Sequence, residues 1–79
     1  MAKRDTITTD KLLANGYAPD EENSNLLIKC SNGRCVGVYF SSAGYWCLYV
    51  ADNDEEIATF KRLHTMSEVN FITNAYLFG

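Results

Sequence analysis

An Asn-Gly pair at residues 32–33, between two short runs of β-forming residues, is the feature that most restricts the possible folds. The runs are LLIKC at 26–30 and CVGVYF at 35–40. Asn-Gly is the strongest short hairpin signal, because both central residues of a type I′ turn need positive φ. The sequence therefore predicts an antiparallel hairpin in which Ser31 pairs with Arg34 and Cys30 lies opposite Cys35.

Two further strands are predicted after this hairpin. YWCLYVA at 45–51 and IATFKRL at 57–63 are rich in aromatic and β-branched residues, and the turns SSAG and DNDEE precede them. We interpret APDEENSN at 18–25 as an acidic loop. Residues 1–6 are polar, and we expect them to be flexible.

Helices are predicted at both ends of the chain. Thr8 has the N-cap residue type, and Asn15-Gly16 is typical of a helix end. Thr65 and Glu68 have capping-box spacing, and the apolar Val69, Ile72 and Tyr76 follow on one helical stripe.

These elements predict an α+β fold within one domain spanning residues 1–79. We expect a four-stranded antiparallel meander with a short N-terminal helix and a longer C-terminal helix packed on one face. A chain of 79 residues leaves no room for a second core.

The charge distribution argues against a protein that binds nucleic acid through its phosphates. The formal net charge is −3, and the seven basic residues are scattered rather than clustered. No segment is apolar enough for a signal peptide or a membrane span, so we expect a cytoplasmic protein. Three cysteines in a reducing compartment are then expected to be free thiols.

The cysteines leave several chemical interpretations open. The predicted register brings the Cα atoms of Cys30 and Cys35 to about 4.5 Å, which makes a cross-strand disulfide conceivable. Cys47 and His64 would complete a zinc ligand set or supply a catalytic Cys–His pair. We favour plain side chains, and we expect no catalytic residue, no metal, no cofactor and no enzyme activity.

The aromatic residues suggest a binding surface. By strand alternation Trp46, Leu48 and Val50 share one face, and Tyr45, Cys47 and Tyr49 share the other. One helical layer covers a single face, so tyrosines remain exposed on the other face and favour recognition of a protein partner. The candidate binding residues come from this face and from two acidic segments: Tyr39, Tyr45, Tyr49, Asp20, Glu21, Glu22, Asp52, Asp54 and Glu55.

Two alternatives concern these same segments. RCVGVYF at 34–40 is faintly similar to an RNA-binding strand motif, so a nucleic-acid-associated regulator that uses the aromatic face is the second hypothesis. Asp52, Asp54 and Glu56 alternate as in a calcium loop, but the central glycine and the distal glutamate of such a loop are missing. We interpret DNDEE as a solvated turn.

The two ends of the chain carry a resemblance to a family. ITTDKLLANGY and TMSEVNFITNAYLFG resemble uncharacterised small proteins of bacteria, phages and mobile elements. Those proteins begin with I-T-x-x-x-L-L-x-N-G-aromatic and close with T-x-x-E-L-x-x-L-x-x-A-L-x-G. The matching residues are Ile7, Thr8, Leu12, Leu13, Asn15, Gly16 and Tyr17 at the start, and Thr65, Glu68, Val69, Ile72, Ala75 and Tyr76 at the end.

The resemblance implies a context and no catalytic residue. It implies a phage or mobile-element accessory protein that binds a host protein. We therefore expect a non-catalytic protein-binding module that inhibits a host defence protein by steric occlusion. A second copy of the chain is another expected partner, because a small open sheet has exposed edges.

Overall fold

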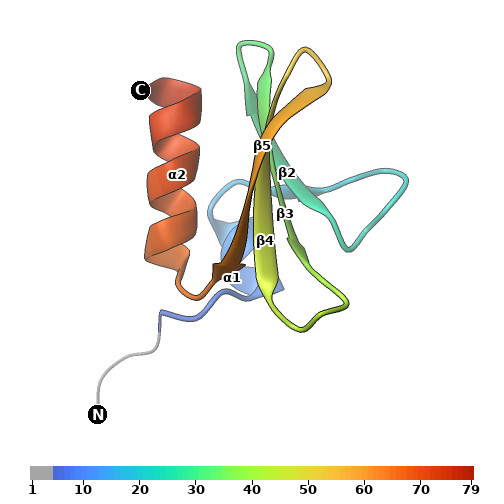
Figure 1. Ribbon diagram of the computed structural model, residues 1–79, viewed down its shortest axis with the longest axis vertical. Coiled ribbons are helices and arrows are strands. Elements are labelled where there is room, and N and C mark those ends of the chain that lie inside the picture. Colours follow the sequence, from blue (N-terminus) through green and yellow to red (C-terminus); the bar gives the residue numbers. More distant parts are fainter. Residues whose placement is uncertain (1–4) are drawn as a thin grey trace.

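The computed structural model describes residues 5–79 and contains one antiparallel sheet flanked by two helices (Figure 1). The strands follow one another in space in the order β1-β2-β3-β4-β5, which is a meander. The predicted α+β class and the two terminal helices are confirmed, but the sheet has five strands and not four. The elements are α1 (Thr9–Ala14), β1 (Ala18–Pro19), β2 (Leu27–Ser31), β3 (Arg34–Phe40), β4 (Trp46–Asp52), β5 (Glu55–Leu63) and α2 (Met66–Phe78).

The strand that the sequence did not reveal is β1, inside the segment interpreted as an acidic loop. It pairs Ala18 with Ile28 and Pro19 with Leu27. A strand of two residues is too short to show the alternation of apolar and polar side chains by which strands are recognised. Proline has no backbone N–H to donate to a neighbouring strand, so Pro19 fits only at the edge of the sheet. The strand therefore forms because β2 offers an edge, and its own residue types do not favour it.

The predicted central hairpin has the register that the Asn-Gly pair required. Asn32 and Gly33 have φ values of 55° and 81°, and Ser31 pairs with Arg34. The hairpin between β4 and β5 also has a two-residue turn with positive φ, in which Asn53 and Asp54 have φ values of 53° and 69°.

Both helix starts are capped by the predicted threonines. The Thr8 hydroxyl accepts a hydrogen bond from the backbone N–H of Lys11, and Gly16 ends this helical segment at φ 95°. Thr65 and Glu68 form a complete capping box at the start of α2. Each cap satisfies backbone N–H groups that have no partner within the helix.

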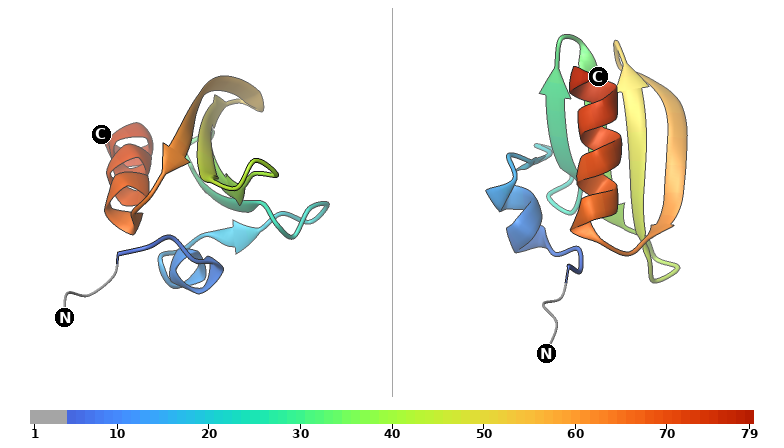
Figure 2. Two further views of the ribbon diagram at one scale, coloured as in Figure 1. Left: turned by 60° about the horizontal axis from the view of Figure 1, so that its bottom comes forward. Right: turned by 90° about the vertical axis from the view of Figure 1, so that its left-hand side faces the viewer.

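Both helices lie on one face of the sheet, and the core lies between them and the strands (Figure 2). This covered face contributes alternate strand residues, which are almost completely buried: Leu27, Val36, Val38, Leu48 and Val50. One buried hydrogen bond joins the segment after α1 to α2, because the Tyr17 hydroxyl lies 2.6 Å from Oγ1 of Thr73. Burial raises the pKa of Tyr17, and the hydrogen bond to Thr73 lowers it.

α2 is not centred on the sheet. It packs mainly on β2 and β3, and the basic side chain of Arg34 anchors its end by donating to the Tyr76 carbonyl at 3.0 Å. The Tyr76 hydroxyl in turn donates to the Ala51 carbonyl at 2.8 Å. As a result α2 lies to one side of β5.

Our expectation of a flexible segment at residues 1–6 needs correction at its end. Thr6 forms a β-bridge with Thr65, and both Met66 and Ser67 donate to Asp5. Residues 1–4 lie outside the described part of the chain. Within residues 5–79 neither helix has the length and apolar character needed to cross a membrane.

Candidate functional site

The sheet face away from the helices, here called the open face, carries most of the tyrosines expected there. Cross-strand pairing places Cys30 opposite Cys35, Tyr39 opposite Cys47, and Gly37 opposite Tyr49. The predicted division of β4 is therefore right: Trp46, Leu48 and Val50 face the helices, and Cys47 and Tyr49 face away. The open face is not uniformly exposed, because Cys47 is 2% exposed.

A glycine in β3 determines how Tyr49 lies. A Cβ atom at Gly37 would be 2.2 Å from Cε2 of Tyr49, so the ring lies directly against the backbone of the neighbouring strand. Glycine inside a strand leaves such a gap, and an aromatic ring from the next strand fills it. Tyr49 is therefore held flat on the open face, with one side of its ring available.

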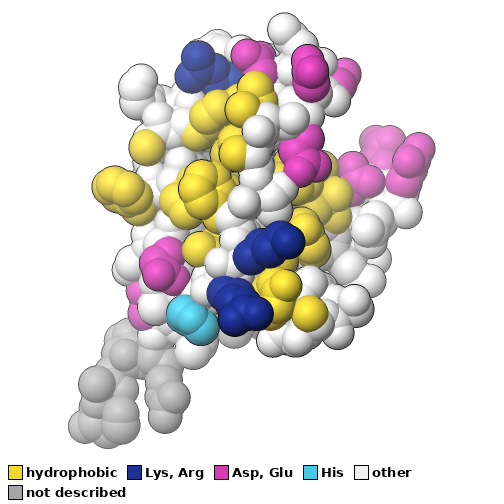
Figure 3. Space-filling view, viewed as in Figure 1, with side chains coloured by type: hydrophobic (Ala, Val, Ile, Leu, Met, Phe, Trp, Pro, Cys, Tyr) yellow, Lys and Arg dark blue, Asp and Glu magenta, His cyan; other side chains and the backbone are white. Residues whose placement is uncertain are grey.

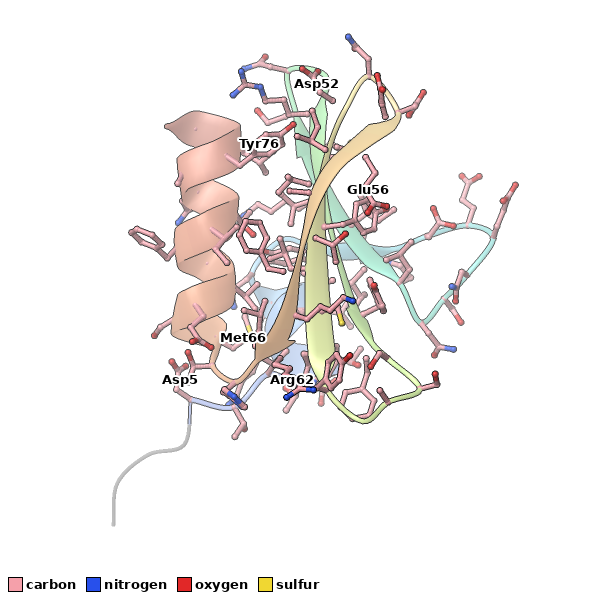
Figure 4. The ribbon with its side chains drawn as sticks, viewed as in Figure 1. Asp5, Asp52, Glu56, Arg62, Met66 and Tyr76 are labelled. Carbon is pink, nitrogen blue, oxygen red and sulfur yellow. A yellow bond between two sulfur atoms is a disulfide. The ribbon has the colours of Figure 1, made fainter. Side chains whose placement is uncertain are left out.

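Glu56 is a candidate residue of the open face that was not among the binding residues expected from the sequence. It lies opposite Ala51, on the same face as Tyr49, and accepts a hydrogen bond from the Thr59 hydroxyl (Figure 4). A signal for it was present, since treating Asn53-Asp54 as a two-residue turn pairs Ala51 with Glu56 and fixes its side of the sheet.

Two open hollows meet at Tyr49 and Glu56. The first has a volume of about 510 Å³, and the second, of about 420 Å³, is bounded by the loop that joins β1 to β2. Tyr49 and Glu56 line both hollows and so form a ridge between them. The other lining residues are Asp20, Ile28, Cys30, Cys35, Ala51 and Asp54 in the first, and Asn23, Asn25, Leu26, Tyr39 and Phe40 in the second.

The expectation of free thiols at Cys30 and Cys35 is wrong. Their sulfur atoms form a disulfide of 2.04 Å, with the two Cα atoms 4.0 Å apart. The hairpin register places the two residues directly opposite each other, which brings their sulfur atoms within bonding distance. The disulfide lines the first hollow, and Cys47 is the free cysteine.

Tyr39 and Tyr45 extend the open face toward the turn between β3 and β4. Burial raises the pKa of Tyr39, and the neighbouring Cys47, Glu56 and Tyr45 raise it further. The guanidinium of Arg62 lies 5.3 Å from the centre of the Tyr45 ring. The Tyr39 side of the face is therefore close to Glu56, while Tyr45 is already engaged by a cation of its own chain.

The acidic candidates divide into three groups by position. Asp20 and Asp54 lie beside the first hollow, and Asp20 and Glu56 both raise the pKa of Tyr49, after the larger effect of burial. Asp52 and Glu55 pair with each other, and the alternation of β4 puts them on the covered side instead.

Glu21 and Glu22 are exposed on the loop between β1 and β2. Figure 3 shows the acidic side chains of this loop standing out to one side of the molecule.

The residues suggested for metal or thiol chemistry are not assembled. His64 donates its backbone N–H to Glu68 at the start of α2, and two of the three thiols are used in the disulfide. Residues 5–79 contain no group of three or more His, Cys, Asp or Glu side chains placed to hold a metal ion.

The chain has no match among known protein-family models, curated protein sequences or solved structures.

Proposed function

We propose that this protein is a non-catalytic binding module that recognises another protein through the open face of its sheet. The observation that carries this proposal is the ridge of Tyr49 and Glu56 between two hollows. A flat aromatic ring gives a large rigid contact area, and the carboxylate beside it gives direction to a polar contact.

The chemistry of the face favours a partner segment that carries lysine or arginine. Asp20, Asp54 and Glu56 supply negative charge around the first hollow, and Tyr49 supplies an aromatic face. Cations bind favourably over such rings, and hydrogen bonds to a carboxylate are among the stronger ones. A basic side chain placed on the ridge would meet both groups at once.

The same charge counts against the nucleic-acid alternative. Phosphates need lysine and arginine, and the basic residues Lys61 and Arg62 lie at the far end of β5 from Asp54. Stacking of bases on Tyr49 would bring their phosphates toward the carboxylates. A protein partner therefore fits the face better than RNA or DNA.

The biological setting comes from the sequence resemblance described above. We propose a phage or mobile-element accessory protein that acts in the cytoplasm of a bacterial host. It would inhibit a host defence protein by steric occlusion, because a bound module covers part of the surface of its partner and needs no catalytic step. In that compartment the Cys30–Cys35 bond would be subject to reduction.

Affinity capture from lysate of the native host, followed by mass spectrometry, tests the proposal. Tyr49→Ser and Glu56→Gln should each weaken capture of the specific partner by about tenfold or more, since central aromatic and charged residues dominate interfaces. Asp10→Asn makes the same charge change as Glu56→Gln on exposed α1 and should leave capture unchanged.

Two outcomes would contradict the proposal. One is capture of the same proteins by the wild type and by both open-face variants, after circular dichroism has shown that all are folded. The other is capture that disappears with nuclease treatment and falls steeply with salt, which would establish nucleic-acid binding.

A further inference from the structure

The edge strand β5 is an interaction surface distinct from the open face. It is nine residues long, and within residues 5–79 it pairs with β4 alone. The opposite edge, β1, has only two residues. A long edge exposes backbone N–H and C=O groups that favour pairing with another strand.

Large apolar side chains along this edge are exposed to solvent. Ile57 is 61% exposed and Phe60 is 41% exposed. Phe60 also forms one wall of an apolar groove of about 370 Å³, whose other walls include Phe71 and Tyr76 of α2. The groove exists because α2 is displaced toward β2 and β3, which leaves the β5 side of the covered face without a helix.

The charges of β5 are arranged so that the strand complements itself. Glu55 and Glu56 stand at its start, and Lys61 and Arg62 stand near its end. Figure 3 shows acidic side chains at one end of this region, basic ones at the other and hydrophobic ones between them. Two such strands side by side in antiparallel orientation bring the acidic end of each next to the basic end of the other. Parallel strands would oppose like charges.

We infer that β5 is the interface of a symmetric homodimer in which two copies pair their β5 strands antiparallel about Thr59. Ala58 of one copy then lies opposite Phe60 of the other. Both residues belong to the covered side, since they pair with Val50 and Leu48 within the chain. The two Phe60 rings become diagonal neighbours, a separation that aromatic side chains can span.

The irregularities of β5 favour a closed dimer over an open-ended fibre. The ladder with β4 shifts register between Val50 and Ala51 and again between Trp46 and Leu48. Such bulges limit strand addition to the regular stretch Ala58–Phe60, and the charged residues on either side of it then meet through their side chains alone. After dimerisation the joined sheet ends at two copies of β1, which are too short to recruit further chains.

Sedimentation equilibrium over a micromolar to submillimolar concentration series, at low ionic strength, tests this interface. The wild type should be a dimer at the upper concentrations. Glu55→Lys and Lys61→Glu should each weaken dimerisation by about tenfold, because each change occurs twice in the dimer and places a charge beside the like-charged end of the other β5 strand.

The decisive measurement mixes the two variants. In a mixture of Glu55→Lys and Lys61→Glu, a strand with added positive charge can pair with one with added negative charge. A heterodimer tighter than either homodimer is therefore expected. Glu21→Lys makes the same charge change on the loop after β1 and should leave the wild-type dimer intact.

Three outcomes would overturn the inference. The first is a wild type that stays monomeric throughout the series. The second is a dimer that Glu21→Lys weakens as much as Lys61→Glu does, which would place the interface elsewhere. The third is a mixture of the two variants that dimerises no better than each alone.

Discussion

The two faces of this sheet come from the same strands but are organised by different forces. On the covered face, side chains such as Val36, Val38 and Leu48 are fully buried against the helices. On the open face, a glycine, a disulfide and an aromatic ring fill the surface, and Glu56 remains exposed beside Tyr49. The comparison indicates that the covered face supplies the core, while the open face keeps a carboxylate and an aromatic ring at the surface, where we propose that a partner binds.

The largest effect is expected from a cavity on the covered face. Leu48→Ala should lower the free energy of unfolding by about 2–5 kcal/mol, since Leu48 is completely buried between Val38 and Phe60 in neighbouring strands. Urea unfolding followed by circular dichroism measures it. A loss as small as that of an exposed residue would mean that this side of the sheet is not the main core.

The next effect concerns the contact that holds Tyr49 on the open face. Gly37→Ala should cost about 1–3 kcal/mol, because the added methyl overlaps the Tyr49 ring. In a Tyr49→Ala background the same substitution should cost much less. A double-mutant cycle of unfolding free energies checks this coupling, and additive costs would show that the ring does not lie on the glycine.

Removal of the disulfide should have a moderate effect on stability. Cys30→Ser combined with Cys35→Ser is expected to cost up to about 2 kcal/mol, because the bond closes only a short loop of the chain. Reduction of the wild type should add the mass of two hydrogens, which mass spectrometry detects. A wild-type mass that reductant leaves unchanged would show that the thiols are free, as the sequence analysis expected.

The smallest effect is a pH dependence at the start of α2. Hydrogen bonds from the backbone of His64 and Thr65 lower the pKa of Glu68 from its ordinary value near 4.5. The unfolded chain therefore binds more protons than the folded one in this range, so stability is present above pH 4.5 and is lost as the pH falls below it.

Glu68→Gln isolates this contribution. The difference in unfolding free energy between the wild type and Glu68→Gln should be largest near neutral pH and should shrink as the pH decreases below about 4.5. Thermal unfolding at a series of pH values measures the difference. A difference that does not vary with pH would contradict a role for the Glu68 charge.

Much of the fold was predictable because its signals are local. The capping box of Thr65 and Glu68, the cap at Thr8 and the Asn32-Gly33 turn each act over a few residues. The turn also fixed the hairpin register, and alternation then assigned Tyr49 to the open face. Such features depend on backbone geometry that short segments already prefer.

The candidate site was predictable only in part. Tyr39, Tyr49, Asp20 and Asp54 lie on or beside the open face, but the turn geometry moved Asp52 and Glu55 to the other side. Glu56 entered the site through its register opposite Ala51. A shift of one residue in strand register moves every side chain to the opposite face of the sheet. The acidic residues around a turn can therefore be assigned to a face only when the residues that form the turn are known.

The sequence by itself determined the two capped helices, the central hairpin and the division of β4 into a buried and an open side. These depend on residue type and short spacing. The tertiary structure decided that Pro19 would join a sheet edge, that Tyr49 would lie on Gly37, and that α2 would pack mainly on β2 and β3. Each of these depends on which segments distant in sequence meet in space, and no local preference carries that information.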